Sequence, residues 1–145
     1  MANDELYTPK WIFDALGVTF DLDVASSTNP YIQVPALNKF TIDDDAFNQE
    51  WYGFVWINPP FSKPKHWVSK WLEHGNGIAL TPIGGNGKWL QELWESEAAC
   101  LVLPPNVGFI NTQNIEKKIM YRVGLWAIGA DPIQILKESN LGKVR

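Results

Sequence analysis

A run of apolar, β-favouring residues leads straight into Asn58-Pro59-Pro60-Phe61, and these four residues could do chemistry together. The run, residues 54–57, predicts a buried strand. The prolines lack N–H groups and have a fixed φ, so the strand ends there and Asn58 is held extended. The Asn58 side-chain carbonyl and a neighbouring backbone carbonyl are then both acceptors, and Phe61 adds a flat apolar face. Two acceptors and an aromatic face suit an exocyclic amine on a flat ring, such as adenine N6.

The same residues also have a simpler interpretation, a strand-ending turn with a packed phenylalanine. An Asn-Pro-Pro-aromatic string is expected by chance in roughly one chain in a thousand of this length. The string alone favours a functional site only slightly, so the interpretation needs further residues elsewhere in the chain that could belong to the same site.

Polar residues also stand where other predicted elements begin or end. Thr8 and Pro9 predict a helix start, with Thr8 as the N-cap and Pro9 at the first helical position. Asp23 lies near the end of a strand predicted over 18–24, and the small residues from Ala25 onward would admit a ligand. Ligands bind at the carboxyl ends of strands in open α/β sheets, so Asp23 could hold an ammonium group. The alternative is a carboxylate on an exposed strand face.

Asp45 closes a run of three carboxylates and is followed by Phe47. Such a run is usually a solvated turn or a helix start. Beside Phe47, however, one of these carboxylates could accept a hydrogen bond from the amino group of an adenine. Polar residues at the ends of successive elements are typical of an α/β ligand cleft.

A basic edge follows the Asn58 loop and could contact phosphates, although such an edge is commonly only a solvated face. Lys88 stands at the end of a glycine-rich loop, 84–87, which lacks the dinucleotide and P-loop spacings and is interpreted as a mobile lid or substrate loop. The candidate nucleic-acid contacts are Ser62, Lys63, Lys65, His66, Lys70 and Lys88.

Strands and helices alternate along the chain, which predicts an α/β domain with a mostly parallel central sheet flanked by helices, antiparallel at its end. Helices are expected over 8–16, 62–74, 88–97 and 131–136, the third with Trp89, Leu90, Leu93 and Trp94 inward. Strands are expected over 18–24, 37–41, 54–57, 77–82, 99–103, 107–110 and 122–129. Residues 1–7 are interpreted as a frayed start and 111–116 as a polar loop.

Length and composition fit one compact domain over residues 1–145, without a separate recognition domain. No signal peptide or bilayer-length apolar run is present, so we expect a cytoplasmic protein. Cys100 is the sole cysteine and is expected to be buried, and no His or Cys spacing predicts a metal site. Residues 1–58 carry nine acidic and two basic side chains, which suits a cationic small molecule, whereas the remainder is mildly basic.

With these positions placed, the sequence resembles the phage-type DNA N6-adenine methyltransferases, small enzymes that use S-adenosylmethionine. The matching stretches are 8–13, 20–26, 44–47 with Trp51, and 58–62, and lesser matches continue to 109. The resemblance implies a reduced Rossmann-like methyltransferase fold. It also implies that the cofactor is held by Thr8, Pro9, Asp23, Ala25, Asp45 and Phe47. Asp45 would take the cofactor's adenine amino group, and Phe47 would pack on its ring.

The reaction implied by the resemblance is direct methyl transfer to adenine N6 in double-stranded DNA, without a metal. The target base would flip into a pocket formed by Asn58, Pro59, Pro60 and Phe61. Two features depart from the family pattern. Residues 25–27 replace the usual glycine-rich turn, and the 22 positions from Asp23 to Asp45 are too few for a helix, a strand and a second helix.

Two alternatives stay open. The same Asn-Pro-Pro-aromatic chemistry would serve a methyltransferase that acts on a glutamine amide in a protein. The departures from the family pattern would instead fit a binding protein on a methyltransferase fold that has lost catalysis.

Overall fold

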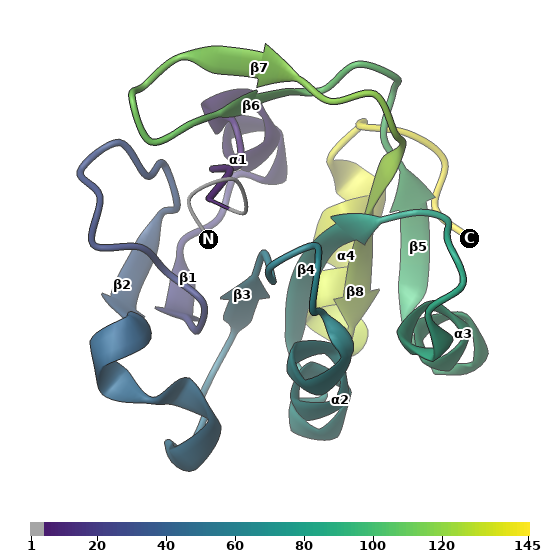
Figure 1. Cartoon of the computed structure of the whole chain (residues 1–145). Coiled ribbons are helices and arrows are strands. Elements are labelled where there is room, and N and C mark those ends of the chain that lie inside the picture. Colours follow the sequence, from purple (N-terminus) through teal and green to yellow (C-terminus); the bar gives the residue numbers. More distant parts are fainter. Residues whose placement is uncertain (1–4) are drawn as a thin grey trace.

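The computed structural model describes residues 5–145, so residues 1–4 of the predicted frayed start lie outside them. For Tyr7 the prediction is wrong, because this residue is buried and pairs with Ile110. Within residues 5–145 a six-stranded sheet runs in the order β2-β1-β3-β4-β8-β5, and β6 and β7 form a separate hairpin (Figure 1). The sheet strands are β1 (Phe20–Asp23), β2 (Ala36–Lys39), β3 (Val55–Ile57), β4 (Gly77–Pro82), β5 (Ala99–Val102) and β8 (Val123–Ile128). The helices are α1 (Lys10–Leu16), α2 (Lys65–His74), α3 (Lys88–Glu95) and α4 (Ala130–Glu138).

The predicted mostly parallel α/β sheet is confirmed. Strands β2, β1, β3 and β4 are mutually parallel neighbours, and β8 is antiparallel to both β4 and β5. The antiparallel pairings lie at one end of the sheet, as expected. Strand β8 pairs with all six residues of β4, so β5 joins on the outside and becomes the edge.

Helices cover both faces of the sheet, because most strand residues are apolar on both sides. Helices α1 and α4 contact each other over a core that includes Phe20 and Trp56. Helices α2 and α3 contact each other over a second core that includes Trp71 and Trp126. All three residues of β3 are buried, so this strand leads from between the two cores into the Asn58 loop.

Strand β1 contains an irregularity that sets the direction of Asp23. The N–H groups of Asp21 and Leu22 both donate to the Phe54 carbonyl, at 2.8 and 3.3 Å, which is the two-against-one pattern of a β-bulge. Phe20 accordingly packs in the Trp56 core whereas Leu22 packs in the other. Asp23 pairs in register with Trp56 and returns to the Trp56 side of the sheet.

Three other sequence predictions at the level of elements are wrong. Pro9, not Thr8, occupies the N-cap of α1, because Pro9 has the extended backbone and the Thr8 side chain is engaged elsewhere. Trp94 is 67% exposed, since α3 turns mainly Leu93 toward the sheet. Residues 111–116, expected as a polar loop, contribute Glu116 to a strand, although the sequence there has no alternation of apolar and polar residues.

The unexpected strand belongs to a hairpin of β6 (Gly108–Ile110) and β7 (Glu116–Lys118), which lies across the top of the view in Figure 1. Ile110 exchanges backbone hydrogen bonds with Tyr7, at 2.7 and 3.0 Å. The Asn29 side chain donates to the Thr112 carbonyl at 3.1 Å. The hairpin is therefore attached to two segments from the beginning of the chain.

Two other features of the described residues bear on earlier expectations. Cys100 is buried, as expected, and burial raises the pKa of its thiol to about 11. None of the helices in the described part of the chain is long and apolar enough to cross a membrane.

Gly77 at the start of β4 is a strict packing requirement. A Cβ there would overlap the Val55 carbonyl oxygen and press on Trp71 Nε1, both of which are buried in the sheet and its α2 face. We expect Gly77→Ala to lower the free energy of unfolding by roughly 2–4 kcal/mol, measured by urea titration. Gly75→Ala is the control, because its Cβ would meet nothing closer than 3.9 Å and only its φ of +74° is strained. It should cost about 1 kcal/mol, and an equal loss in both variants would contradict the steric argument.

Candidate functional site

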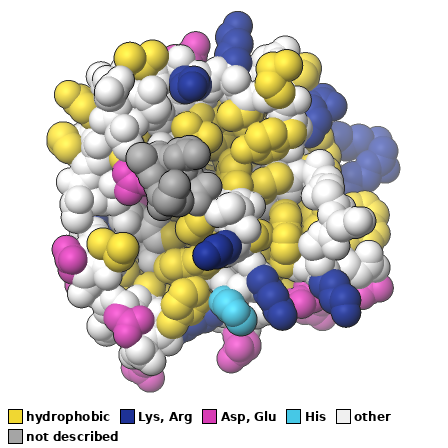
Figure 2. All heavy atoms as spheres, viewed as in Figure 1, with side chains coloured by type: hydrophobic (Ala, Val, Ile, Leu, Met, Phe, Trp, Pro, Cys, Tyr) yellow, Lys and Arg dark blue, Asp and Glu magenta, His cyan; other side chains and the backbone are white. Residues whose placement is uncertain are grey.

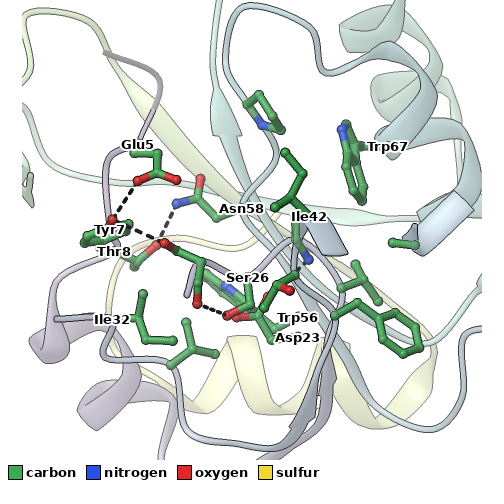
Figure 3. Close-up of a pocket in the computed structure, with 18 of the residues that line it drawn as sticks. Glu5, Tyr7, Thr8, Asp23, Ser26, Ile32, Ile42, Trp56, Asn58 and Trp67 are labelled. Carbon is green, nitrogen blue, oxygen red and sulfur yellow. Dashed lines mark hydrogen bonds between the residues drawn. The ribbon is translucent and has the colours of Figure 1, made fainter. Parts of the chain in front are cut away.

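A pocket of about 420 Å³ lies at the carboxyl ends of β1 and β3. Its size falls in the range of small-molecule sites, roughly 300–1,000 Å³. Its lining comes from segments 5–8, 23–27, 40–47 and 56–60, together with Ile32, Val34 and Trp67 (Figure 3). The predicted site residues that meet in it are Thr8, Asp23, Ala25, Asp45, Phe47, Asn58 and Pro60. Residues separated by up to 52 positions are thus brought together.

Asn58 is held in one orientation by its amide nitrogen. Nδ2 donates to the Leu6 carbonyl at 3.1 Å and to Thr8 Oγ1 at 3.2 Å. A backbone carbonyl can only accept, so the nitrogen and not the oxygen must face Leu6. Asn58 Oδ1 is left buried without a hydrogen-bond partner in the described structure. A buried acceptor without a partner costs free energy, about 1–3 kcal/mol, that a donor on a ligand would recover.

Thr8 lies between the pocket and the core, and its side chain is 2% exposed. Its hydroxyl accepts from Asn58 and keeps one hydrogen that it can donate to a ligand. Thr8 was predicted as a helix cap and as a ligand contact. The structure uses its hydroxyl to orient Asn58, a pairing that no local sequence pattern contains.

Asp23 is almost fully buried, with 3% of its side chain exposed (Figure 3). Burial raises the pKa of this carboxyl to about 7, against the opposing effects of the Ser26 side chain, the Ala25 N–H and the Lys39 charge. The Ala25 N–H donates to Asp23 Oδ1 at 3.3 Å. The pocket therefore holds a carboxylate that a cationic group would stabilise. The alternative of a solvent-exposed Asp23 is wrong.

The charged side chains among the described lining residues are all acidic: Glu5, Asp23 and Asp45. No lysine or arginine of the described residues lines this pocket. The local charge thus follows the acidic first part of the sequence and favours a cationic ligand.

Two aromatic rings stand at the Asp45 end of the pocket. Phe47 and Trp67 lie with ring centroids 4.3 Å apart at an interplanar angle of 44°. Asp45 has a positive φ of 51° and accepts from the Asn48 side chain. The segment from 46 to 49 is held by Lys70, whose Nζ donates to the carbonyls of residues 46, 47 and 49 at 2.8–3.1 Å. This end of the pocket offers an exposed carboxylate beside apolar ring faces.

Three predicted residues lie outside the lining. Pro9 caps α1, and Pro59 is buried beneath the loop. Phe61 packs edge-on against Phe109 and Tyr121, with centroids 5.9 and 6.1 Å apart. Phe61 keeps partial exposure, so it is a neighbour of the pocket and also fastens the β6–β7 hairpin to the Asn58 loop.

The predicted basic contacts separate into three groups. Ser62, Lys63, Lys65 and His66 are exposed just beyond the Asn58 loop. Lys70 is engaged with backbone carbonyls and stands over the Trp51 ring, 5.1 Å from its centroid, so it acts in the fold. Lys88 borders a second hollow of about 490 Å³ next to α3.

Many lining residues are not among those predicted from the sequence, and Glu5, Tyr7, Trp56 and Trp67 are four of them. Trp67 was expected only on the inward face of a helix, and the spacing of α2 also turns it toward the Phe47 ring. Trp56 alternates with the buried Val55 and Ile57, and its Nε1 is buried without a partner in the described structure. Strand alternation could have indicated Trp56, whereas nothing local indicates Glu5.

Among residues 5–145, no three His, Cys, Asp or Glu side chains gather where they could hold a metal ion.

Comparison with known proteins gives one consistent result. A family model described as DNA N-6-adenine-methyltransferase (Dam) matches residues 1–119. The DNA N-6-adenine-methyltransferase of Escherichia phage T1 is 27% identical over 133 residues, which are 86% of this chain and 52% of that protein. The chain thus spans about half the length of this curated relative. No solved structure matches it.

The raised pKa of Asp23 predicts how stability changes with pH. The folded state binds this proton more tightly than the unfolded state, so stability falls as pH rises from the ordinary value of 3.8 through about 7. Asp23→Asn removes this loss. We expect the variant to be more stable than the wild type at pH 8, by at most about 4 kcal/mol, with the advantage disappearing near pH 4.

Urea unfolding at several pH values between 4 and 8 measures the difference. Asp43→Asn, on an exposed carboxylate, is the control and should change little at any pH. If the Asp23→Asn protein were instead less stable than the wild type at pH 8, contacts in the folded state would have to stabilise the ionised carboxylate, and the prediction would be wrong.

Proposed function

The chain belongs to the DNA N-6-adenine-methyltransferase (Dam) family, and from this premise we propose that it transfers a methyl group from S-adenosylmethionine to adenine N6 in double-stranded DNA. The resemblance read from the sequence motifs is confirmed by the family match. The observation that carries the proposed reaction is the buried, unpartnered Asn58 Oδ1 in a pocket whose charged lining is acidic.

The charge and the size of the pocket support S-adenosylmethionine as its ligand. The cofactor has a cationic ammonium and a cationic sulfonium, and both are favoured by an acidic lining. Asp23, with Thr8 and the Ala25 backbone beside it, would hold the ammonium end. Asp45 would accept from the cofactor's adenine amino group, and the Phe47 ring would pack on the base. When bound, S-adenosylmethionine supplies a methyl group already activated by the sulfonium.

Asn58 would hold the target amine. Its Oδ1 accepts one amine hydrogen, and the Pro59 carbonyl, which no described hydrogen bond uses, would accept the other. Accepting both hydrogens raises electron density on the nitrogen and directs its lone pair away from the two acceptors. Because Leu6 and Thr8 already fix the amide, Asn58 needs no reorganisation when the amine arrives.

A duplex adenine reaches such a pocket only after leaving the base stack, which costs a few kcal/mol. The exposed part of Phe61 would stack on the extruded base, and Lys63, Lys65 and His66 beside it would contact the backbone phosphates. These contacts would offset the cost of opening the duplex. Ser62 and Lys88 remain candidate contacts of the same kind.

One observation favours an alternative without turnover. Strand β1 passes to β2 with no α-helix between them in the described chain, so the shortened 23–45 segment lacks the element that the family pattern places there. A binding protein on a methyltransferase fold would fit this reduction. It differs from the proposed enzyme in a measurable way, since it would bind the cofactor weakly or not at all.

Asn58→Ala tests the reaction. Unmethylated, mixed-sequence duplex DNA is incubated with the protein and S-adenosylmethionine, and N6-methyladenine is quantified by mass spectrometry. The wild type should form methyladenine, and the variant should lose roughly 100-fold or more in rate, because it lacks the acceptor that polarises the amine. Cofactor binding by calorimetry should survive the change.

The same assay distinguishes the proposed DNA methyltransferase from the two alternatives. No methyladenine with intact cofactor binding would leave another amine, such as a protein glutamine amide, as the substrate. No methyladenine and no cofactor binding would leave the binding protein.

Asp23→Asn also tests the cofactor site. The substitution that is expected to raise stability at pH 8 should weaken binding of the cofactor. The variant keeps the size and lining of the pocket but lacks the charge that faces the ammonium group. We expect the dissociation constant for S-adenosylmethionine to rise at least tenfold by calorimetry at pH 7.5. Wild-type affinity should also strengthen from pH 6 to 7.5 as Asp23 ionises, whereas the variant should show no such trend. Equal affinity of the two proteins at pH 7.5 would place the ammonium elsewhere.

A further inference from the structure

The most exposed large apolar side chain in the described structure, Met120 at 92%, directly follows the β6–β7 hairpin. We propose that Met120 is a wedge that enters the base stack of duplex DNA when the target adenine leaves it, while Lys117, Lys118 and Arg122 contact the neighbouring phosphates. The proposal rests on the proposed function and names the surface by which the pocket would gain access to a duplex.

Met120 protrudes from a rigid base. Ile119 before it is 6% exposed and donates its N–H to the Val107 carbonyl at 3.2 Å. The Arg122 carbonyl accepts from the Ile83 N–H at 2.9 Å, and Val123 is fully buried. Only residues 120–122 stand out between these two fixed points. A projection held in this way can keep its position against a partner without paying a large ordering cost.

The protrusion is linked to both walls of the pocket. Through Ile110, the hairpin pairs with Tyr7, the residue before Thr8. Tyr121 contacts Phe61, three positions after Asn58, with ring centroids 6.1 Å apart. Three residues span at most about 11 Å, and the two ring side chains and the contact between them add to this, so Met120 lies within roughly 30 Å of Asn58, about nine base-pair steps along a duplex. One DNA site could therefore contact Met120 and deliver a base to Asn58.

Charge on this surface is complementary to DNA. Lys117, Lys118 and Arg122 are all exposed on either side of Met120, and Glu116 is the acidic residue among them. Figure 2 shows hydrophobic side chains in a band down the middle of the face below the hairpin, with Lys and Arg side chains beside and beneath it. An apolar projection flanked by cations is the arrangement by which proteins pry apart base steps while holding the backbone.

An exposed methionine is suited to this task. Its side chain is unbranched and polarisable, so it can fill an irregular gap between bases and contact their faces. Burial between bases would also remove the apolar surface that Met120 leaves in water. Filling the gap stabilises the opened duplex, and the extruded adenine then returns to the stack more slowly.

Met120→Ala separates wedge action from methyl transfer. The same unmethylated DNA is offered in duplex form and after heat denaturation, and N6-methyladenine is measured in each. The variant should lose at least tenfold on the duplex and change less than twofold on single strands, where no stack must be opened. Met120→Leu should retain the wild-type ratio of the two rates. Leu37→Ala, which truncates a 71% exposed side chain on β2, is the matched surface control and should alter neither rate.

A second readout does not depend on turnover. Permanganate oxidises thymines that have lost their stacking and pairing, so it detects an opened duplex in the absence of methyl transfer. Wild-type protein should raise thymine reactivity in duplex DNA, and Met120→Ala should abolish the increase.

The wild type could open the duplex, as seen by permanganate, and yet form no methyladenine. If Met120→Ala then lost the permanganate reactivity, the wedge would be upheld and the proposed function rejected. An unchanged duplex-to-single-strand ratio with unchanged permanganate reactivity would overturn the wedge. So would an equal loss on both DNA forms.

Discussion

The arrangement of the site depends on the hydrogen bonds that fix the Asn58 amide. Leu6 and Thr8 occupy its nitrogen, so the oxygen stays buried without a partner. The same two bonds join the end of β3 to the segment before α1, which are about fifty residues apart in sequence. The chain thus retains an unsatisfied acceptor that lowers stability, and a ligand amine would satisfy it. This is the usual relation between a preorganised site and its cost in stability.

The acidic lining follows the same logic. Burial of Asp23 opposes its ionisation, and neither the Ala25 N–H nor the Lys39 charge restores its ordinary pKa. A cation in the pocket would supply the missing stabilisation. The β-bulge at Asp21 and Leu22 contributes to this burial, because Asp23 lies after it on the Trp56 side of the sheet, where the pocket is. The position of the carboxylate thus favours a cationic ligand and, at neutral pH, lowers the stability of the folded protein.

The shortened segment between Asp23 and Asp45 is compensated by contacts from elsewhere. Lys70 on α2 holds three carbonyls of the Asp45–Gln49 segment, and Trp67 supplies a ring to Phe47. On the opposite side, the β6–β7 hairpin pairs with Tyr7 and packs against Phe61. Helix α2 and the β6–β7 hairpin come after the motifs in the sequence, and they hold in place the segments that line the pocket.

The sequence by itself determined the α/β alternation, the buried strand before Asn58 and the positions of Asp23 and Asp45 at element ends. Periodicity, prolines and composition are local signals, so these features could be predicted. Tertiary structure alone decided that Thr8 binds Asn58 instead of capping α1, that Lys70 serves the fold, and that β8 enters the sheet between β4 and β5. It also decided the hairpin and the exposure of Met120. These outcomes depend on which distant groups meet, and a hydrogen bond across fifty residues leaves no periodic trace in the sequence.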